Sequence, residues 1–172
     1  LELESEPVLK PCTDQRFAVN LYSAGVVFHT KPFDKAVEVS GYTRLHAWMS
    51  LDVPDTDFAV DLYEILKDGS SILLTSDILR ARYRKSTRHE ELIVPGEINE
   101  YVFDGFTLFC RQISKGSRLR LVIKCNNTPQ AEKNYNAGGR VEEESGVDAR
   151  TANITLYHDR QHPSRLELPI GR

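Results

Sequence analysis

The sequence predicts an all-β protein, a sandwich or barrel built from short strands. Apolar and polar residues alternate with a period of two along several stretches, which is the pattern of strands that bury one face. Turn-forming residues separate these stretches at short intervals. No stretch keeps a clear helical period over several turns. A chain of 172 residues is long enough for one domain with its own hydrophobic core.

The longest alternating stretch runs from Val37 to Leu51. Its odd positions are mostly apolar and suit a core, whereas even positions such as Arg44 and Trp48 suit a wetter or partner-facing side. Further strands are predicted at 58–63, 72–84, 119–125, 154–156 and 166–170. Turns are predicted at 52–56, Asp68-Gly69, Pro95-Gly96 and Lys115-Gly116.

We expect one sandwich domain at residues 27–172, preceded at 1–26 by a lead-in segment that is an edge strand or a linker. The chain begins with Leu1 and not with methionine, so we expect a trimmed fragment. No positively charged start precedes an apolar stretch, which predicts no signal peptide.

The composition bears on partners and compartment. The net charge of −3 and the pI near 6.0 give no overall positive field, so we expect no nucleic-acid partner. No apolar run is long enough to cross a bilayer, so we expect no membrane partner. The three cysteines, Cys12, Cys110 and Cys125, are odd in number and form no CxxC pair. We therefore expect reduced thiols, which favours the cytoplasm.

The residues predict no catalytic group, no metal and no cofactor. A Gly-x-Ser-x-Gly nucleophile turn is absent, and the nearest match, Gly69-Ser70-Ser71, follows a hairpin turn and lacks the second glycine. His158 and His162 are spaced as a metal pair would be on a helix, but here they follow a strand. The pair Asp55 and Asp57 is open to two interpretations, a calcium loop or carboxylates that accept backbone N–H groups in a turn.

Three surfaces remain as candidate interfaces or ligand sites. Arg80, Arg82 and Arg84 are predicted on one face of one strand, where like charges need facing acids, an anion or a partner surface. Tyr42 and Trp48 share a predicted face that suits sugar rings or another domain. The Asn-rich and Glu-rich stretch 126–150, with Asn134 and Asn136, is predicted to be a long solvated loop ordered by neighbours in a full protein.

Several motifs follow one another in a characteristic order. They are Asp55-Thr-Asp57-Phe58, Asp68-Gly69, Leu79-Arg-Ala-Arg82-Tyr83-Arg84, Pro95-Gly96-Glu97, Lys115-Gly116-Ser117-Arg118-Leu119-Arg120-Leu121 and Ser164-Arg-Leu-Glu-Leu-Pro169-Ile170. By order and spacing, over roughly residues 27–170, they resemble the C-terminal domain of the X-Pro dipeptidyl-peptidase and cocaine-esterase-like serine hydrolases.

The resemblance implies a jelly-roll β-sandwich of the galactose-binding type. In that family the domain follows an α/β-hydrolase domain that carries the catalytic triad, packs on it, shapes the active-site rim and assists oligomerisation. The expected partners are therefore a catalytic domain and further copies of the same protein. The family-pattern residues here are expected to make turns or to pack in the sheets and interfaces; they are Asp57, Phe58, Gly69, Arg82, Tyr83, Gly96 and Glu97.

The chain departs from the family pattern around its long loop. Ser117 replaces the usual histidine before Arg118, and Ala137 stands where threonine is common. The resemblance therefore implies least about the contacts of that loop with a catalytic domain. Two hypotheses about function follow, an accessory domain of a serine hydrolase and an independent carbohydrate-binding module.

Overall fold

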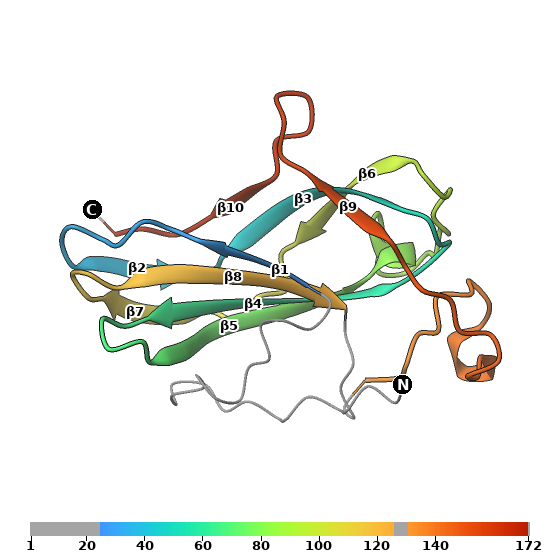
Figure 1. The fold of residues 1–172 in the computed structure, drawn as a ribbon, viewed down its shortest axis with the longest axis horizontal. Helices are drawn as coiled ribbons and strands as arrows, with labels where there is room; N and C mark the ends of the chain where they lie inside the picture. The colour runs from blue at the N-terminus through green and yellow to red at the C-terminus, as the bar shows by residue number, and fades with distance from the viewer. Residues whose placement is uncertain (1–24, 126–130, 172) are drawn as a thin grey trace.

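The computed structural model describes residues 25–125 and 131–171 (Figure 1). Within this part of the chain the elements are β1 (Gly25–His29), β2 (Val37–Gly41), β3 (Arg44–Leu51), β4 (Asp57–Ile65), β5 (Ser71–Arg80), a 3-10 turn (Ala81–Tyr83), β6 (Ile98–Phe103), β7 (Phe109–Ile113), β8 (Arg118–Cys125), a second 3-10 turn (Val141–Glu143), β9 (Ile154–Tyr157) and β10 (Arg165–Glu167). Most of the predicted lead-in segment, residues 1–24, lies outside the described residues. No described helix has the length and apolar character needed to cross a bilayer.

The described strands form an antiparallel β-sandwich. One sheet has the strand order β1-β8-β4-β5, and in the other β3 pairs with β6 on one side and with β9 and β10 on the other (Figure 1). The strands β2 and β7 form a short third sheet, and Val39 of β2 bridges to Ile170. The all-β prediction is confirmed, whereas the jelly-roll, galactose-binding-like arrangement stays a prediction from the resemblance.

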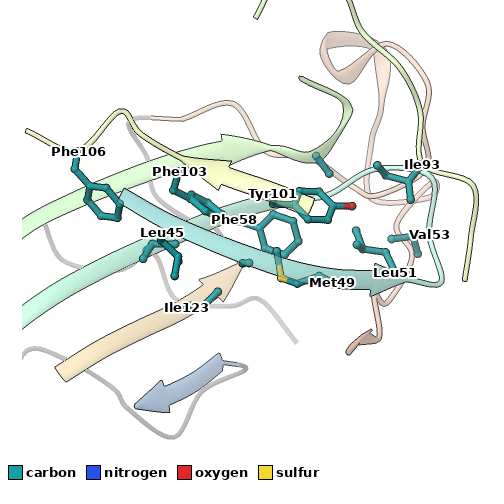
Figure 2. Close-up of a cluster of buried hydrophobic side chains, with 13 residues drawn as sticks. Leu45, Met49, Leu51, Val53, Phe58, Ile93, Tyr101, Phe103, Phe106 and Ile123 are labelled. Carbon is teal, nitrogen blue, oxygen red and sulfur yellow. The ribbon is translucent and has the colours of Figure 1, made fainter. Parts of the chain in front are cut away.

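The main core fills the space between the two large sheets (Figure 2). The ring of Phe58 on β4 meets two rings of β6 edge-on, with centroid distances of 5.4 Å to Tyr101 and 6.3 Å to Phe103. Edge-to-face pairs of this kind add stability beyond the burial of their area. Met49 of β3 and Ile123 of β8 close the same cluster, so both sheets contribute to one core.

The strand β4 is buried along its whole length. Leu62 belongs to a second buried cluster with Val39 of β2 and Ile113 of β7, while Tyr63 belongs to a third with Leu73 and Val122. The strand also pairs with β8 on one side and with β5 on the other, so it is a central strand with both of its faces buried. The sequence pattern predicted only one buried face for this strand.

The predicted strand from Val37 to Leu51 is two strands in different sheets. The chain turns between Gly41 and Arg44, and Gly41 has a φ of +137°, which only glycine adopts without strain. A Cβ at Gly41 would also lie 3.1 Å from Cβ of Pro169. The alternation itself is confirmed, since Leu45, Met49 and the odd residues between them are buried.

The predicted strand 72–84 is also wrong at its end. It stops at Arg80 because the backbone N–H of Ala81 donates to the carbonyl oxygen of Thr56, after which a 3-10 turn begins. Arg80, Arg82 and Arg84 therefore do not share one strand face. The strands β1, β6 and β7 had no sequence prediction, because their stretches lack a sustained alternation.

Truncation of the central ring tests this core. We expect Phe58→Ala to lower the free energy of unfolding by about 3–5 kcal/mol, because the cavity would lie at the contact of both sheets. Ile78→Ala on β5, where the side chain is 54% exposed, is the control and should change it by no more than about 0.5 kcal/mol. Urea denaturation of both variants measures the difference, and equal losses would contradict the assignment of the core.

Candidate functional site

A network of arginines and carboxylates joins four segments at the end of the sandwich where the orange loop lies in Figure 1. The segments are the loop 52–56, the end of β5 with its 3-10 turn, the loop 84–97 and the loop 131–150. At the centre are Asp55 and Arg82, which are 0% and 5% exposed. Charged side chains are rarely buried this fully unless they are paired.

The Asp55 carboxylate holds Arg82 through both of its oxygens. Oδ2 accepts from Nε of Arg82 at 2.7 Å, and Oδ1 accepts from the backbone N–H of the same residue at 2.9 Å. The outer nitrogens of the guanidinium reach Oε2 of Glu90 at 3.1 Å and the carbonyl oxygen of Gly139 at 2.8 Å. Burial alone would lower the pKa of Arg82, but these hydrogen bonds and charges outweigh it and the pKa is raised.

A second pair lies beside the first, between Arg80 and Asp57. The guanidinium meets the carboxylate in a fork, with Nε donating to Oδ1 at 2.8 Å and Nη2 donating to Oδ2 at 3.0 Å. The hydrogen bonds to Asp57 raise the pKa of Arg80. Bidentate pairing of this kind fixes orientation as well as charge, so the end of β5 is locked to the start of β4.

Asn134 connects the two pairs. Its Nδ2 group donates to Oδ2 of Asp55 at 2.7 Å and to Oδ1 of Asp57 at 2.9 Å. Its Oδ1 accepts the backbone N–H of Asn136 at 2.8 Å. One amide therefore spaces two carboxylates and anchors the long loop to them.

The described part of the long loop is held by hydrogen bonds within the domain, whereas its ordering by neighbours in a full protein stays a prediction. The carboxylate of Glu144 accepts the backbone N–H groups of Tyr135 at 3.1 Å and Gly139 at 2.8 Å. Gly138 has a φ of +85°, and a Cβ there would lie 2.7 Å from Cγ of Pro54. Glycine at this position lets the loop approach the sandwich closely.

Arg84 extends the network toward the loop 84–97. Its side chain is 2% exposed, and Nη2 donates to Oε1 of Glu91 at 2.9 Å while Nε reaches Oδ1 of Asn99 at 3.3 Å. Lys85 donates to the same Glu91 oxygen at 2.6 Å. The hydrogen bond from Lys85 and the charges of Lys85 and Arg84 lower the pKa of Glu91.

The three arginines thus find their acids within the domain. Of the alternatives open from the sequence, facing acids are the ones observed, although the acids come from loops as well as from a strand. Asp55 and Asp57 both pair with arginines, and the backbone N–H that Asp55 accepts is that of Arg82 and not one of its own turn. Among the described residues no three His, Cys, Asp or Glu side chains are grouped as a metal site.

Tyr42 and Trp48 lie apart. Tyr42 is 69% exposed in the turn before β3, whereas Trp48 is half-buried and its ring meets that of His162 at 5.4 Å. Tyr42 precedes the strand, and the four strand residues from Arg44 to Trp48 carry the chain roughly 13 Å further along β3. The two rings therefore do not form a single flat platform.

The family-pattern residues occupy turns, pairs and core positions. Gly69 and Gly96 both have a φ of +86°, which confirms the two predicted turns. The N–H of Gly96 donates to the carbonyl oxygen of Leu51 at 2.7 Å. Tyr83 ends the 3-10 turn, and exposed Glu97 closes the loop through its N–H to Val94 at 3.0 Å.

The serines and histidines that were considered as catalytic or metal-binding residues lie in a hairpin and in a turn. Ser70 and Ser71 are buried at the start of β5, in the hairpin that follows Asp68. His158 bridges to Pro163, and the N–H of His162 donates to Oδ1 of Asp159 at 2.9 Å, which confirms the predicted turn between them.

Comparison with known proteins gives the family. Residues 6–167 match the family described as the X-Pro dipeptidyl-peptidase C-terminal non-catalytic domain. The chain belongs to this family. It is also similar to the cocaine esterase of Rhodococcus sp. (strain MB1 Bresler), with 31% identity over 143 residues that cover 83% of the chain and 25% of that enzyme.

Solved structures agree on the fold. An aminopeptidase from a marine sediment archaeon, Thaumarchaeota archaeon, superposes with a TM-score of 0.84 at 19% identity, over 94% of this chain and 28% of its own. An alpha-amino acid ester hydrolase gives 0.84 at 20% identity, over 93% and 27%. A CocE/NonD family hydrolase from Staphylococcus aureus gives 0.65 at 19% identity, over 86% and 30%. The family domain thus spans about a quarter of its relatives' length.

Sequence reasoning missed the acids that complete the network, namely Glu90, Glu91 and Glu144. They lie in loops without periodicity, and nothing in their spacing marks them as partners of the arginines. The one available signal was the cluster of three arginines, because like charges need acidic partners nearby. This signal predicts that such acids exist but does not identify them in the sequence.

Loss of one partner of the buried pair Asp55 and Arg82 is predicted to lower the stability of the fold strongly. We expect Arg82→Met to lower the free energy of unfolding by about 3–5 kcal/mol, because it leaves the Asp55 carboxylate buried and unpaired. Arg140→Met is the matched control, since Arg140 pairs with Glu142 and Glu143 while 71% exposed. Exposed pairs contribute about 1 kcal/mol or less, so thermal and urea unfolding should separate the two variants. Similar losses would contradict a structural role for the network.

Glu91 should make stability depend on pH. Its folded pKa lies below the ordinary value of 4.5, so its pairing stabilises the fold above that value and is lost as pH falls through the folded pKa. The stability difference between the parent chain and Glu91→Gln should therefore be constant near neutral pH and shrink below about pH 4.5. Denaturation at a series of pH values measures this, with Glu97→Gln as control. A difference that persists unchanged to low pH would count against the pairing.

Proposed function

We propose that this domain is the accessory C-terminal module of an α/β-hydrolase serine peptidase or esterase. It packs on the catalytic domain, shapes the rim of the active site and assists oligomerisation. The observation that carries the proposal is the buried network, which uses charged groups to hold two loops rigidly at one end of the sandwich. Family membership supports a catalytic neighbour.

The loops held by the network carry exposed apolar side chains. Val94 in the loop 84–97 is 62% exposed, and Val147 in the loop 131–150 is 94% exposed. Leu92 is 44% exposed and lies beside Gly138, so the two loops adjoin. Exposed apolar groups on a rigid surface are the usual features of an interface with another domain. We therefore assign this end, defined by Leu92, Val94 and Val147, as the catalytic-domain surface.

The carbohydrate-binding alternative has less support. It needs an exposed aromatic platform, and of the two candidate rings Tyr42 lies in the turn before β3, while Trp48 lies within β3 and is partly covered by His162. The network at the other candidate surface leaves its carboxylates engaged with arginines instead of sugar hydroxyls.

An interface substitution in the longer natural protein tests the proposal. We expect Val94→Asp to leave the melting temperature of the 172-residue chain within about 2 °C, because the side chain is exposed there. In the longer protein the same change should lower the melting temperature and kcat/KM, because it buries a carboxylate between domains. Ile78→Asp, 54% exposed on β5, is the matched control and should affect neither protein.

Two results would contradict the proposal. One is an equal response of the longer protein to Val94→Asp and Ile78→Asp. The other is hydrolysis of p-nitrophenyl butyrate by the 172-residue chain alone, abolished by a serine-directed inhibitor.

A further inference from the structure

The sheet β1-β8-β4-β5 has a buried outer face, on the side away from the core between the sheets. Tyr63 of β4 is 0% exposed on this face, and Leu73 of β5 and Val122 of β8 are 6% and 5% exposed. With Ile65 and Val27 they form the third buried cluster, and all five residues belong to this one sheet. The other two clusters of the described residues each contain residues from two sheets.

Pairing within a sheet does not bury an outer face by itself. The strand β3 also has neighbours on both sides, with β6 on one side and β9 and β10 on the other. Its outer residues His46, Trp48 and Ser50 nevertheless stay partly exposed. Side chains stand roughly perpendicular to a sheet, so neighbours cover one another's flanks and leave the tips open. The complete burial of Tyr63 therefore requires a layer on top of the face.

A charged pair on the same face is covered as well. Nζ of Lys124 lies 3.1 Å from Oδ2 of Asp61, and the two side chains are only 16% and 10% exposed. Asp61 is the register partner of Val122, so this pair adjoins the apolar cluster. Water would reach both charged groups on an open face. The covering layer therefore extends from the cluster to this pair.

The cover comes from the chain itself, because the burial is that of a single chain and needs no second copy or partner. Outside the described residues the chain has two segments of more than one residue, 1–24 and 126–130. The segment 126–130 continues from Cys125, the register partner of Phe58. Ile65 lies seven residues further along β4, roughly 23 Å away. Five residues span at most about 18 Å, so 126–130 does not reach the far end of the cluster.

The N-terminal segment, residues 1–24, has the required length and position. It joins the sheet at Gly25, which is the register partner of Lys124 and so lies beside the buried charged pair. A chain of 24 residues can span roughly 80 Å, which is several times the length of the cluster. The family match begins at residue 6, so most of this segment is matched together with the rest of the domain.

The composition of the N-terminal segment also fits the face. Phe17, Val19 and Leu21 alternate along the chain, as expected where one side of an extended segment is buried. The segment has four acidic and two basic residues. On the face, burial lowers the pKa of Arg120 and the charge of Arg118 lowers it further, with no described carboxylate among the causes. Carboxylates brought by the segment would offset this unfavourable environment of the guanidinium.

We propose that the N-terminal segment docks on the outer face of the sheet β1-β8-β4-β5 and is an integral layer of the domain. Its apolar side chains cover the cluster around Tyr63, and its carboxylates meet the arginines of β8. This face is then occupied within the chain and does not serve as a docking surface for another domain. The inference is independent of the proposed function, because it concerns a single chain and its test measures no hydrolase activity.

Oxidative footprinting of tyrosines in the 172-residue chain tests the inference. Hydroxyl radicals oxidise a tyrosine ring according to its exposure, and mass spectrometry locates the product. We expect Tyr63 and Tyr101, both 0% exposed, to be protected, and Tyr42, 69% exposed, to be oxidised. Tyr101 lies between the sheets and therefore reports whether the core is intact.

Aspartates at the apolar positions of the N-terminal segment should uncover the face. Protection of Tyr63 should be lost while that of Tyr101 is kept, because carboxylates cannot be buried against the cluster without a partner. The variant combines Phe17→Asp, Val19→Asp and Leu21→Asp. A matched control with three aspartates at polar positions of the same segment should protect Tyr63 as the parent chain does; it combines Gln15→Asp, Asn20→Asp and Ser23→Asp.

Photo-crosslinking locates the segment without a destabilising change. Replacement of Phe17 by p-benzoylphenylalanine keeps an aromatic ring and links it, on irradiation, to the residues that it contacts. We expect linked peptides from β4, β5 or β8, the strands that form the cluster. The same group in place of Tyr42, which is exposed in the turn before β3, should give no such links.

Three results would overturn the inference. They are oxidation of Tyr63 in the parent chain, continued protection of Tyr63 in the apolar variant, and links from position 17 that lie outside the strands β4, β5 and β8. If Tyr101 also loses its protection in the apolar variant, that variant has unfolded, and the links from position 17 in the otherwise unchanged chain decide.

Discussion

The arrangement of the loops depends on the burial of one ion pair, Asp55 with Arg82. Neither side chain could be buried alone, because an unpaired charge in a protein interior is too costly. The backbone N–H of Arg82 is held by the same carboxylate, so the pair also ends β5 and starts the 3-10 turn. Every segment that reaches this pair, from Glu90 to Gly139, is thereby fixed in position.

The hydrophobic core and the network stabilise different parts of the fold. The core around Phe58 holds the two sheets together, and because its contacts are not directional it does not fix the loops. Directional groups do that at the sandwich end, where Asn134 spaces the two carboxylates at hydrogen-bond distance. Because arginines, acids and the amide satisfy one another, the end is rigid without presenting free catalytic groups, which suits a non-catalytic family.

The sequence predicted what depends on local pattern and not what depends on distant partners. Alternation correctly marked the buried positions of β3, and the glycines with positive φ marked two turns. Alternation could not show that the chain changes sheets at Gly41, because the pattern of burial continues through the turn. Nor could it place Glu90 or Asn134 beside Arg82 and Asp55, since these contacts form only when loops far apart in sequence meet.

The same limit applies to an apolar groove between the two sheets, lined by Phe28 of β1 and Leu166 of β10. Its walls come from β1, β3, β4, β8, β9 and β10, and its apolar residues, such as Leu45, Leu121 and Leu166, have the sequence signature of ordinary core. It has a volume of about 450 Å³ and lies between β1, an edge strand of one sheet, and the strands β9 and β10 of the other. The sandwich therefore presents two chemically distinct surfaces. One is the end where the charged network is buried, and the other is the side where the apolar groove opens. An apolar segment or ligand would suit the second, whereas the first is suited to a preformed protein surface.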